Sequence, residues 1–209
     1  MRMLARSILV AAPLCLAQAA PVVYDFNDPK QVNTISFSLD STLEPFAGLA
    51  YGVGGQVTFD PDRPEATSGK ITVPSGLVLV PNTDMLRTLQ SDEWLDTANH
   101  PEISFEFRRV AKVEKKPGRE FVLEVEGEMK IKGKAKNLTL TVSATHLPDQ
   151  VRERGGGREG DLLALRTSFT FRRADFDIKP SISPKKVGES VVVTSAIVGY
   201  GGGTPAPKP

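Results

Sequence analysis

Alternation of apolar and polar residues is the feature that most limits what this chain can fold into. From Phe121 to Lys132 every second position is apolar or glycine, and most positions between hold glutamate or lysine. Successive side chains of a strand point to opposite faces, so this segment is predicted to be a strand with one apolar face. The same period recurs at residues 35–39, 103–108, 138–145 and 165–171.

Strands with one apolar and one polar face form antiparallel sheets. Because the apolar face must be covered, we predict an all-β domain whose sheet either closes into a barrel or packs on a second sheet. Residues 82–101 depart from the period of two, since Met85, Leu86 and Leu89 have helical spacing. We expect a short helical insertion here, which Pro101 ends.

The two ends of the chain have compositions of their own. Residues 1–20 carry arginines, then a short apolar run that ends in small residues, which predicts a cleaved secretory signal peptide rather than a membrane span. Leu14 before Cys15 is unfavourable for lipidation of that cysteine. We expect residues 21–199 to form one domain in the periplasm or outside the cell, and the Gly/Pro-rich residues 200–209 to be a disordered tail.

The composition argues against several classes of function. Lysine and arginine number 26 against 25 aspartates and glutamates, so no whole-molecule field favours nucleic acid. His100 and His146 are the only histidines, and neither has a partner at ligand spacing, so we interpret both as surface or turn residues. No nucleophile motif is present. We therefore expect no metal, no cofactor and no catalytic residue, and a protein that is not an enzyme.

Four lysines crowd around Gly133 and are the best electrostatic candidate in the chain. Glutamates continue the same face of the preceding strand, which favours a solvated hairpin over an anion site. The four residues are Lys130, Lys132, Lys134 and Lys136.

Aromatic and aliphatic residues gather on the other, inward phase of the strands. They can simply fill the centre of a small barrel, or they can line a hollow that holds a long apolar ligand, and the pattern alone does not separate these alternatives. The candidate cavity residues are Phe37, Phe59, Trp94, Phe105, Phe107, Phe121, Leu123, Met129, Ile131, Leu140, Phe169, Phe171 and Phe176.

Several motifs follow one another in a fixed order from Val32 to Val198. Among them are "TISFSLD" (34–40), "GGQVTFDPD" (54–62), "LQSDEWLDTANHPEISFEF" (89–107), "VEGEMKIKGKAKNLTLTVSA" (125–144), "SFTFRRADFDI" (168–178) and "VGESVVVTSAIV" (187–198). In this order the chain resembles the YceI-like family of bacterial secreted proteins.

The resemblance implies a lipocalin-like antiparallel barrel with a helical insertion. It also implies an elongated apolar cavity that binds, without covalent attachment, a polyisoprenoid or similar long-chain lipid such as an isoprenoid quinone. The chain departs from the family where Met85 and Leu86 replace a usual Arg-Asp pair and where Asp177 replaces a usual glycine. A head-group site is therefore not carried over to these positions.

Two alternatives to a lipid-binding barrel stay open at this point. The first is a filled barrel that acts as a periplasmic stress-response or interaction module, and the second is an enzyme acting on an apolar substrate. Transient contact with a membrane surface and pairing into a homodimer are also left open.

Overall fold

The computed structural model describes residues 21–155, 157 and 159–202. The expected signal peptide and residues 203–209 of the expected tail lie outside this range. Most of the described chain is β-structure, with one α-helix, α1 (Thr83–Gln90), and three short 3₁₀ turns at Pro64–Ala66, Ser75–Leu77 and Arg173–Phe176. The strands are β1 (Val22–Asp25), β2 (Thr34–Leu39), β3 (Phe46–Ala50), β4 (Gly54–Phe59), β5 (Ser68–Pro74), β6 (Val78–Leu79), β7 (Glu102–Lys116), β8 (Glu120–Ile131), β9 (Lys134–Leu147), β10 (Leu162–Arg172) and β11 (Ser190–Tyr200).

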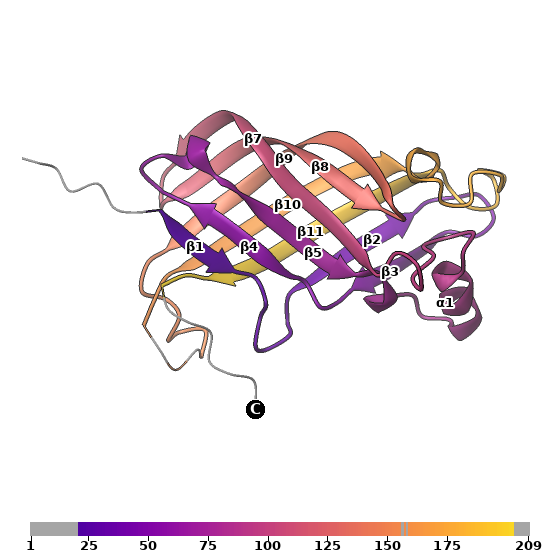
Figure 1. Cartoon of the computed structure of the whole chain (residues 1–209), viewed down its shortest axis with the longest axis horizontal. Helices are drawn as coiled ribbons and strands as arrows, with labels where there is room; N and C mark the ends of the chain where they lie inside the picture. Colours follow the sequence, from indigo (N-terminus) through magenta and orange to yellow (C-terminus); the bar gives the residue numbers. More distant parts are fainter. Residues whose placement is uncertain (1–20, 156, 158, 203–209) are drawn as a thin grey trace, which may run out of the picture.

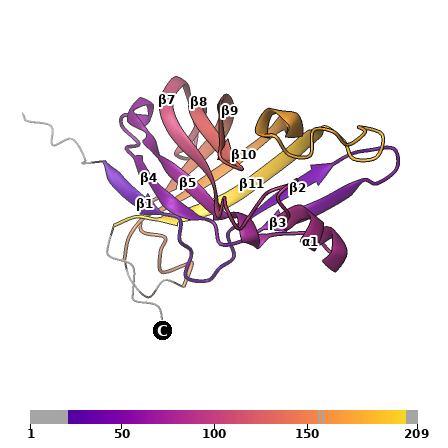
Figure 2. The same ribbon diagram turned by 45° about the vertical axis from the view of Figure 1, so that its right-hand side comes forward.

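These strands form a closed, eight-stranded antiparallel barrel. Strands β1 and β2 are successive pieces of one barrel strand along β11, and β3 and β4 are pieces of the next. The barrel is elongated, with β1 and β4 at one end and α1 at the other (Figures 1 and 2). The prediction of an all-β antiparallel barrel with a short helical insertion is confirmed.

The hairpin of β8 and β9 explains how the alternating pattern sets the register. The two strands pair from Glu120 with Thr145 to Ile131 with Lys134. Lys132 and Gly133 form the turn between them, with φ of 47° and 71°. A two-residue hairpin turn with two positive φ angles matches the twist of the strands, and glycine adopts such a φ without strain. The predicted apolar phase of β8 is the buried one along its whole length.

Gly127 breaks the apolar series of β8 for a steric reason. A Cβ at this position would lie 2.3 Å from Cζ of Phe105 on the paired strand β7. Gly127 therefore makes room for the Phe105 ring inside the barrel, which agrees with the position of this glycine on the apolar face of the strand.

The helical insertion is shorter than the segment 82–101 from which it was predicted. Asn82 caps α1, because its side-chain oxygen accepts the N–H groups of Asp84 and Met85. After Ser91 the chain continues in turns, which bury Trp94 and Leu95.

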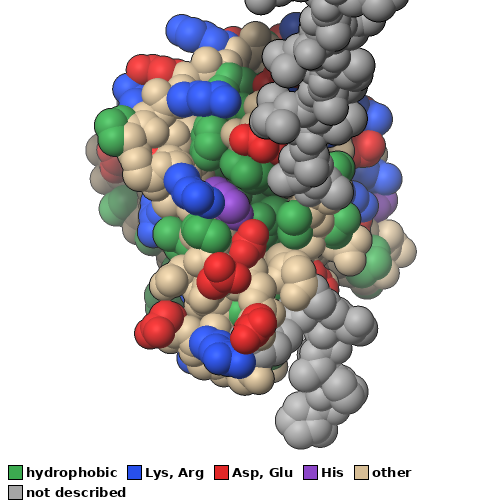
Figure 3. Space-filling model, turned by 90° about the vertical axis from the view of Figure 1, so that its left-hand side faces the viewer, with side chains coloured by type: hydrophobic (Ala, Val, Ile, Leu, Met, Phe, Trp, Pro, Cys, Tyr) green, Lys and Arg blue, Asp and Glu red, His purple; other side chains and the backbone are tan. Residues whose placement is uncertain are grey.

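The barrel is filled at one end and hollow at the other. At the β1 end the inward side chains of Phe59, Phe121 and Leu123 are buried, and the Phe59 and Phe121 rings meet edge-on with centroids 5.3 Å apart. Further along β10 the inward residues Phe169 and Phe171 are only half-buried. We call these the filled end and the hollow end. Figure 3 looks at the filled end, where hydrophobic side chains gather between charged ones.

The interpretation of His146 as a surface or turn residue is wrong. Its side chain is 6% exposed, and its Nε2 lies 3.0 Å from Oδ2 of Asp161. The imidazole packs beside Tyr24 and Phe59 at the filled end, with ring centroids 6.4 Å away in each case. The spacing of residues in the sequence does not reveal this contact, because Asp161 directly precedes β10 and comes close to His146 only when β9 and β10 pair.

A second polar cluster joins three separate segments at the filled end. Asp28 accepts hydrogen bonds from Nη2 of Arg154 at 2.9 Å and from the hydroxyl of Tyr200 at 3.1 Å. Arg154 lies in the glycine-rich segment between β9 and β10, so the cluster anchors that segment. Tyr200 is the last residue of β11 and not the first residue of a tail, which moves the domain boundary beyond residue 199.

We expect Asp28→Asn to destabilise the protein by about 3 kcal/mol at pH 7, because it removes the buried carboxylate that pairs with the partly buried Arg154. Burial alone raises the pKa of Asp28, but the Lys30 N–H, Arg154, Tyr200 and the Val32 N–H hold the pKa below its ordinary value. A lowered pKa means that the carboxylate stabilises the fold above the unfolded-state value, about 4, and that this contribution fades as the pH falls further.

Urea unfolding of both proteins at several pH values checks this expectation. The difference in unfolding free energy between wild type and Asp28→Asn should shrink as the pH falls below about 4. Asp62→Asn, at an exposed turn position, is the matched control and should change little. A difference that is constant across the acid range would contradict the proposed ionic role.

Candidate functional site

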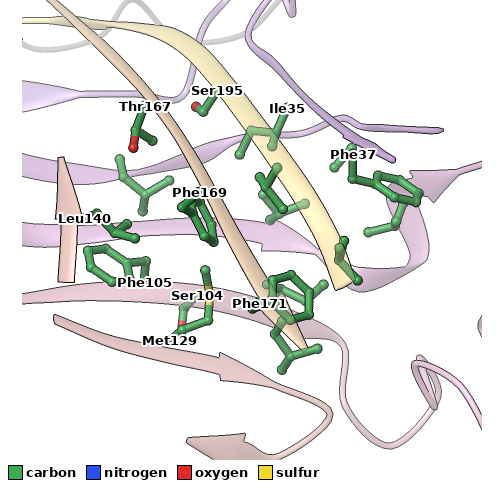
Figure 4. A pocket seen from close by; sticks show the side chains of 18 of the residues that line it. Ile35, Phe37, Ser104, Phe105, Met129, Leu140, Thr167, Phe169, Phe171 and Ser195 are labelled. Atoms are coloured by element: carbon green, nitrogen blue, oxygen red, sulfur yellow. The ribbon is translucent and has the colours of Figure 1, made fainter. Parts of the chain in front are cut away.

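A cavity of about 190 Å³ occupies the hollow end of the barrel. An engineered cavity of about 150 Å³ in another protein is large enough to bind benzene, so this space is far more than a packing defect. Figure 4 shows side chains from several strands pointing into it. Its wall is almost entirely apolar, and residues from every part of the barrel sequence contribute; they include Ile35, Ile71, Phe107, Leu140, Leu165, Phe169, Val193 and Ile197.

Nine of the thirteen residues predicted from the sequence line this cavity. They are Phe37, Trp94, Phe105, Phe107, Met129, Ile131, Leu140, Phe169 and Phe171. The other four do not line it, because they belong to packed parts of the core: Phe59, Phe121 and Leu123 fill the opposite end, and Phe176 packs against Phe171 with ring centroids 5.2 Å apart. The inward phase was readable from the sequence, but the position of each residue along the barrel axis was not.

Large aromatic rings fill the β1 end of the barrel. Both Tyr24 and Phe26 are completely buried there, and a Cβ on Gly199 would lie 2.6 Å from the Phe26 ring, so the glycine leaves room for that ring. At the hollow end, inward-facing residues such as Ile35 and Val193 line the cavity instead. The alternative of a wholly filled barrel does not hold for this half.

Two segments cap the hollow end of the cavity. Trp94 and Leu95 come from the helical insertion, and Ile178 comes from the chain between β10 and β11. The two segments are joined to each other, since the Lys179 N–H donates to the Glu93 carbonyl at 2.9 Å and the two side chains form an ion pair.

Arg173 is the residue that holds one half of the cap in place. Its side chain is 3% exposed and donates to four backbone carbonyls, with distances from 2.7 to 3.1 Å. The acceptors are Ile178, Lys179, Val187 and Gly188.

Arg173 also contributes to the cavity wall. Its guanidinium lies 5.8 Å from the Trp94 ring. Burial lowers the pKa of Arg173, and Glu189 opposes that change. Arg173 lies within the motif "SFTFRRADFDI" but is not among the site residues predicted from the sequence. Alternation along β10 places Arg173 on the same inward phase as Phe171, with Arg172 facing outward between them. A charged residue on the inward phase is the signal that could have identified Arg173.

The three positions that depart from the family pattern lie outside the cavity wall. Met85 is exposed on α1, and Leu86 packs partly against the core. Asp177 has a φ of 57°, in the left-handed region where glycine is least strained, which explains why a glycine suits this position. Its backbone carbonyl accepts a hydrogen bond from Nζ of Lys132 at 2.8 Å.

The other candidate sites have no comparable geometry. Lys130, Lys134 and Lys136 are exposed on the outer face of the β8–β9 hairpin, as a solvated surface requires. Across the described part of the chain, no group of three or more His, Cys, Asp or Glu side chains is placed to hold a metal. No helix within that part is long and apolar enough to cross a bilayer.

The arrangement of barrel, cap and internal cavity agrees with a sequence comparison. A family profile described as the YceI-like domain matches residues 27–198, which is most of the chain. The protein belongs to the YceI-like family. No curated protein sequence matches the chain significantly.

Several solved structures have the same fold. BcnA of Burkholderia cenocepacia is 18% identical, with a TM-score of 0.62 over 82% of this chain and 98% of its own. The Campylobacter jejuni YceI protein is 16% identical, with a TM-score of 0.61 over 77% and 88%. A polyisoprenoid-binding domain from Saccharophagus degradans is 8% identical, with a TM-score of 0.63 over 88% and 100%. At these identities the likeness concerns the fold.

Proposed function

We propose that this YceI-like protein is exported and that it binds a polyisoprenoid or similar long-chain lipid in the cavity at the hollow end. The observation that carries the proposal is a cavity with an almost wholly apolar wall, bounded at one end by the two cap segments rather than filled by side chains. The description of the Saccharophagus degradans domain as polyisoprenoid-binding supports the same ligand class. The signal-like residues 1–20 support export to the periplasm or beyond.

The free energy of binding would come mainly from removing the lipid chain from water. Each buried CH₂ contributes about 0.8 kcal/mol, so an isoprenoid chain needs few polar contacts for tight binding. Ordering the chain offsets part of this gain. The chemistry of the wall, with aromatic rings such as Phe105 and Phe169 and no acid–base pair, favours binding over catalysis.

Trp94 gives a direct test of ligand uptake. It is the single tryptophan of the chain and lies in the cavity wall, so its fluorescence reports what enters the cavity. Titration with farnesol and with longer isoprenoid alcohols should change the Trp94 emission in a saturable way. Native mass spectrometry of the protein recovered from the producing cells should show a co-purified lipid. Repeated absence of both signals would contradict the proposed function.

Export has its own measurement. The amino terminus of the protein recovered from the cell envelope or medium should lie just after Ala19 or Ala20. A full-length chain found only in the cytoplasm would contradict export without bearing on lipid binding.

A further inference from the structure

Four polar residues lie in the wall of the cavity, and two of them have side chains free to meet a ligand. The four are Ser104, Thr167, Arg173 and Ser195. Ser104 lies on the opposite phase of β7 from the inward-facing Ile103 and Phe105, and Arg173 already donates to four carbonyls.

Thr167 and Ser195 are both on the inward phase of their strands. They are direct cross-strand neighbours in the pairing of β10 with β11. Side chains of directly opposed residues on one face of a sheet lie close enough to act on the same ligand group. Figure 4 labels both residues among the side chains that line the cavity.

The hydrogen-bonding capacity of this pair is specific. Oγ1 of Thr167 donates to the carbonyl of Thr141 at 2.8 Å, so its remaining capacity is to accept. Ser195 is 7% exposed, and no group in the described part of the chain forms a hydrogen bond with its hydroxyl. Because Ser195 lines the cavity, its hydroxyl is available to donate to whatever occupies that space.

The pair lies in the inner part of the cavity. One step toward the filled end, Leu165 and Ile197 are buried and also line the cavity; one step toward the cap, Phe169 and Val193 are only half-buried. A group bound by the pair would therefore sit near the inner end of the cavity, with the rest of the molecule extending toward the cap.

We propose that Thr167 and Ser195 form a subsite for one neutral hydroxyl group at the inward end of the lipid, an inference that rests on the proposed lipid-binding function. A ligand hydroxyl donates to Oγ1 of Thr167 and accepts from Ser195, which uses both free capacities at once. A carbonyl uses only the second. A carboxylate is disfavoured, because the one cation of the wall, Arg173, lies at the cap and is occupied by carbonyls.

Four ligands with one isoprenoid chain test the subsite. Farnesol carries a hydroxyl, farnesal a carbonyl, farnesoic acid a carboxylate at pH 7, and farnesene no oxygen. With Trp94 fluorescence as the readout, we expect wild type to bind farnesol about 3- to 10-fold more tightly than farnesal, and farnesoic acid most weakly.

Ser195→Ala should bind farnesol about 3- to 10-fold more weakly than wild type does, while farnesene binding stays unchanged. Ser168→Ala is the matched control, because Ser168 is the neighbour of Thr167 on the outer face and contacts Thr194 there. It should leave all four affinities unchanged.

Two results would overturn the subsite while leaving lipid binding intact. One is equal affinity of wild type for farnesol and farnesene, which would mean that water alone satisfies the hydroxyl pair. The other is unchanged farnesol binding by Ser195→Ala. Failure of all four ligands to bind would overturn the subsite and the proposed function together, so the two failures are distinguishable.

Discussion

Phe169→Asp is expected to abolish isoprenoid binding, with farnesol affinity at least about 100-fold lower than that of wild type. Phe169 points from the middle of β10 into the cavity and is half-buried there. An aspartate at this position places a charge on the wall that a lipid chain would have to strip of water, which is strongly unfavourable. The same charge stays hydrated when the cavity is empty, so the barrel should remain folded.

Trp94 fluorescence measures the binding, and circular dichroism checks the fold of each variant. Lys134→Ala is the control, because Lys134 is exposed at the start of β9 on the outer hairpin. It should bind farnesol as wild type does. If Lys134→Ala lost binding while a folded Phe169→Asp retained it, the ligand would belong to the lysine-rich hairpin and not to the cavity.

Arg173→Ala is expected to lower the stability of the protein by about 3–5 kcal/mol, equivalent to a fall in Tm of roughly 10 °C. The substitution removes a buried guanidinium and leaves four carbonyls of the chain between β10 and β11 without their donor. Because this segment also caps the cavity and lies against Trp94, its release should shift the Trp94 emission to longer wavelength.

Calorimetry and tryptophan emission check this prediction on the unliganded protein. Arg172→Ala is the matched control, since Arg172 is the preceding residue but is exposed and pairs with Glu189 on the surface. An exposed ion pair contributes little, so Tm should hardly change. Equal loss of Tm in the two variants, or an unchanged emission spectrum in Arg173→Ala, would contradict the role assigned to Arg173.

Most of the barrel could be predicted because its information is local. The inward phase of β8 and of β9, the turn at Gly133 and the helical spacing before Leu89 each depend on residues a few positions apart. The family motifs added the closure of the sheet, which alternation alone left open between a barrel and two packed sheets.

The polar residues inside the fold could not be predicted in the same way. The sequence favours a surface or turn position for His146, yet its side chain is buried beside Asp161. Asp28 finds Arg154 and Tyr200 only because loops distant in sequence meet at the filled end. Such partners are set by strand order and loop path, and no sequence spacing encodes them.

The sequence by itself therefore determined the strands, their inward faces, the turn between β8 and β9 and the apolar character of the interior, because side-chain alternation and turn residues act locally. The tertiary structure decided where along the axis that interior is filled and where it is hollow. The physical reason is that packing depends on which side chains meet across the barrel. Phe59 meets Phe121 and the space between them is filled, whereas Phe169 lines a cavity that the side chains around it leave open.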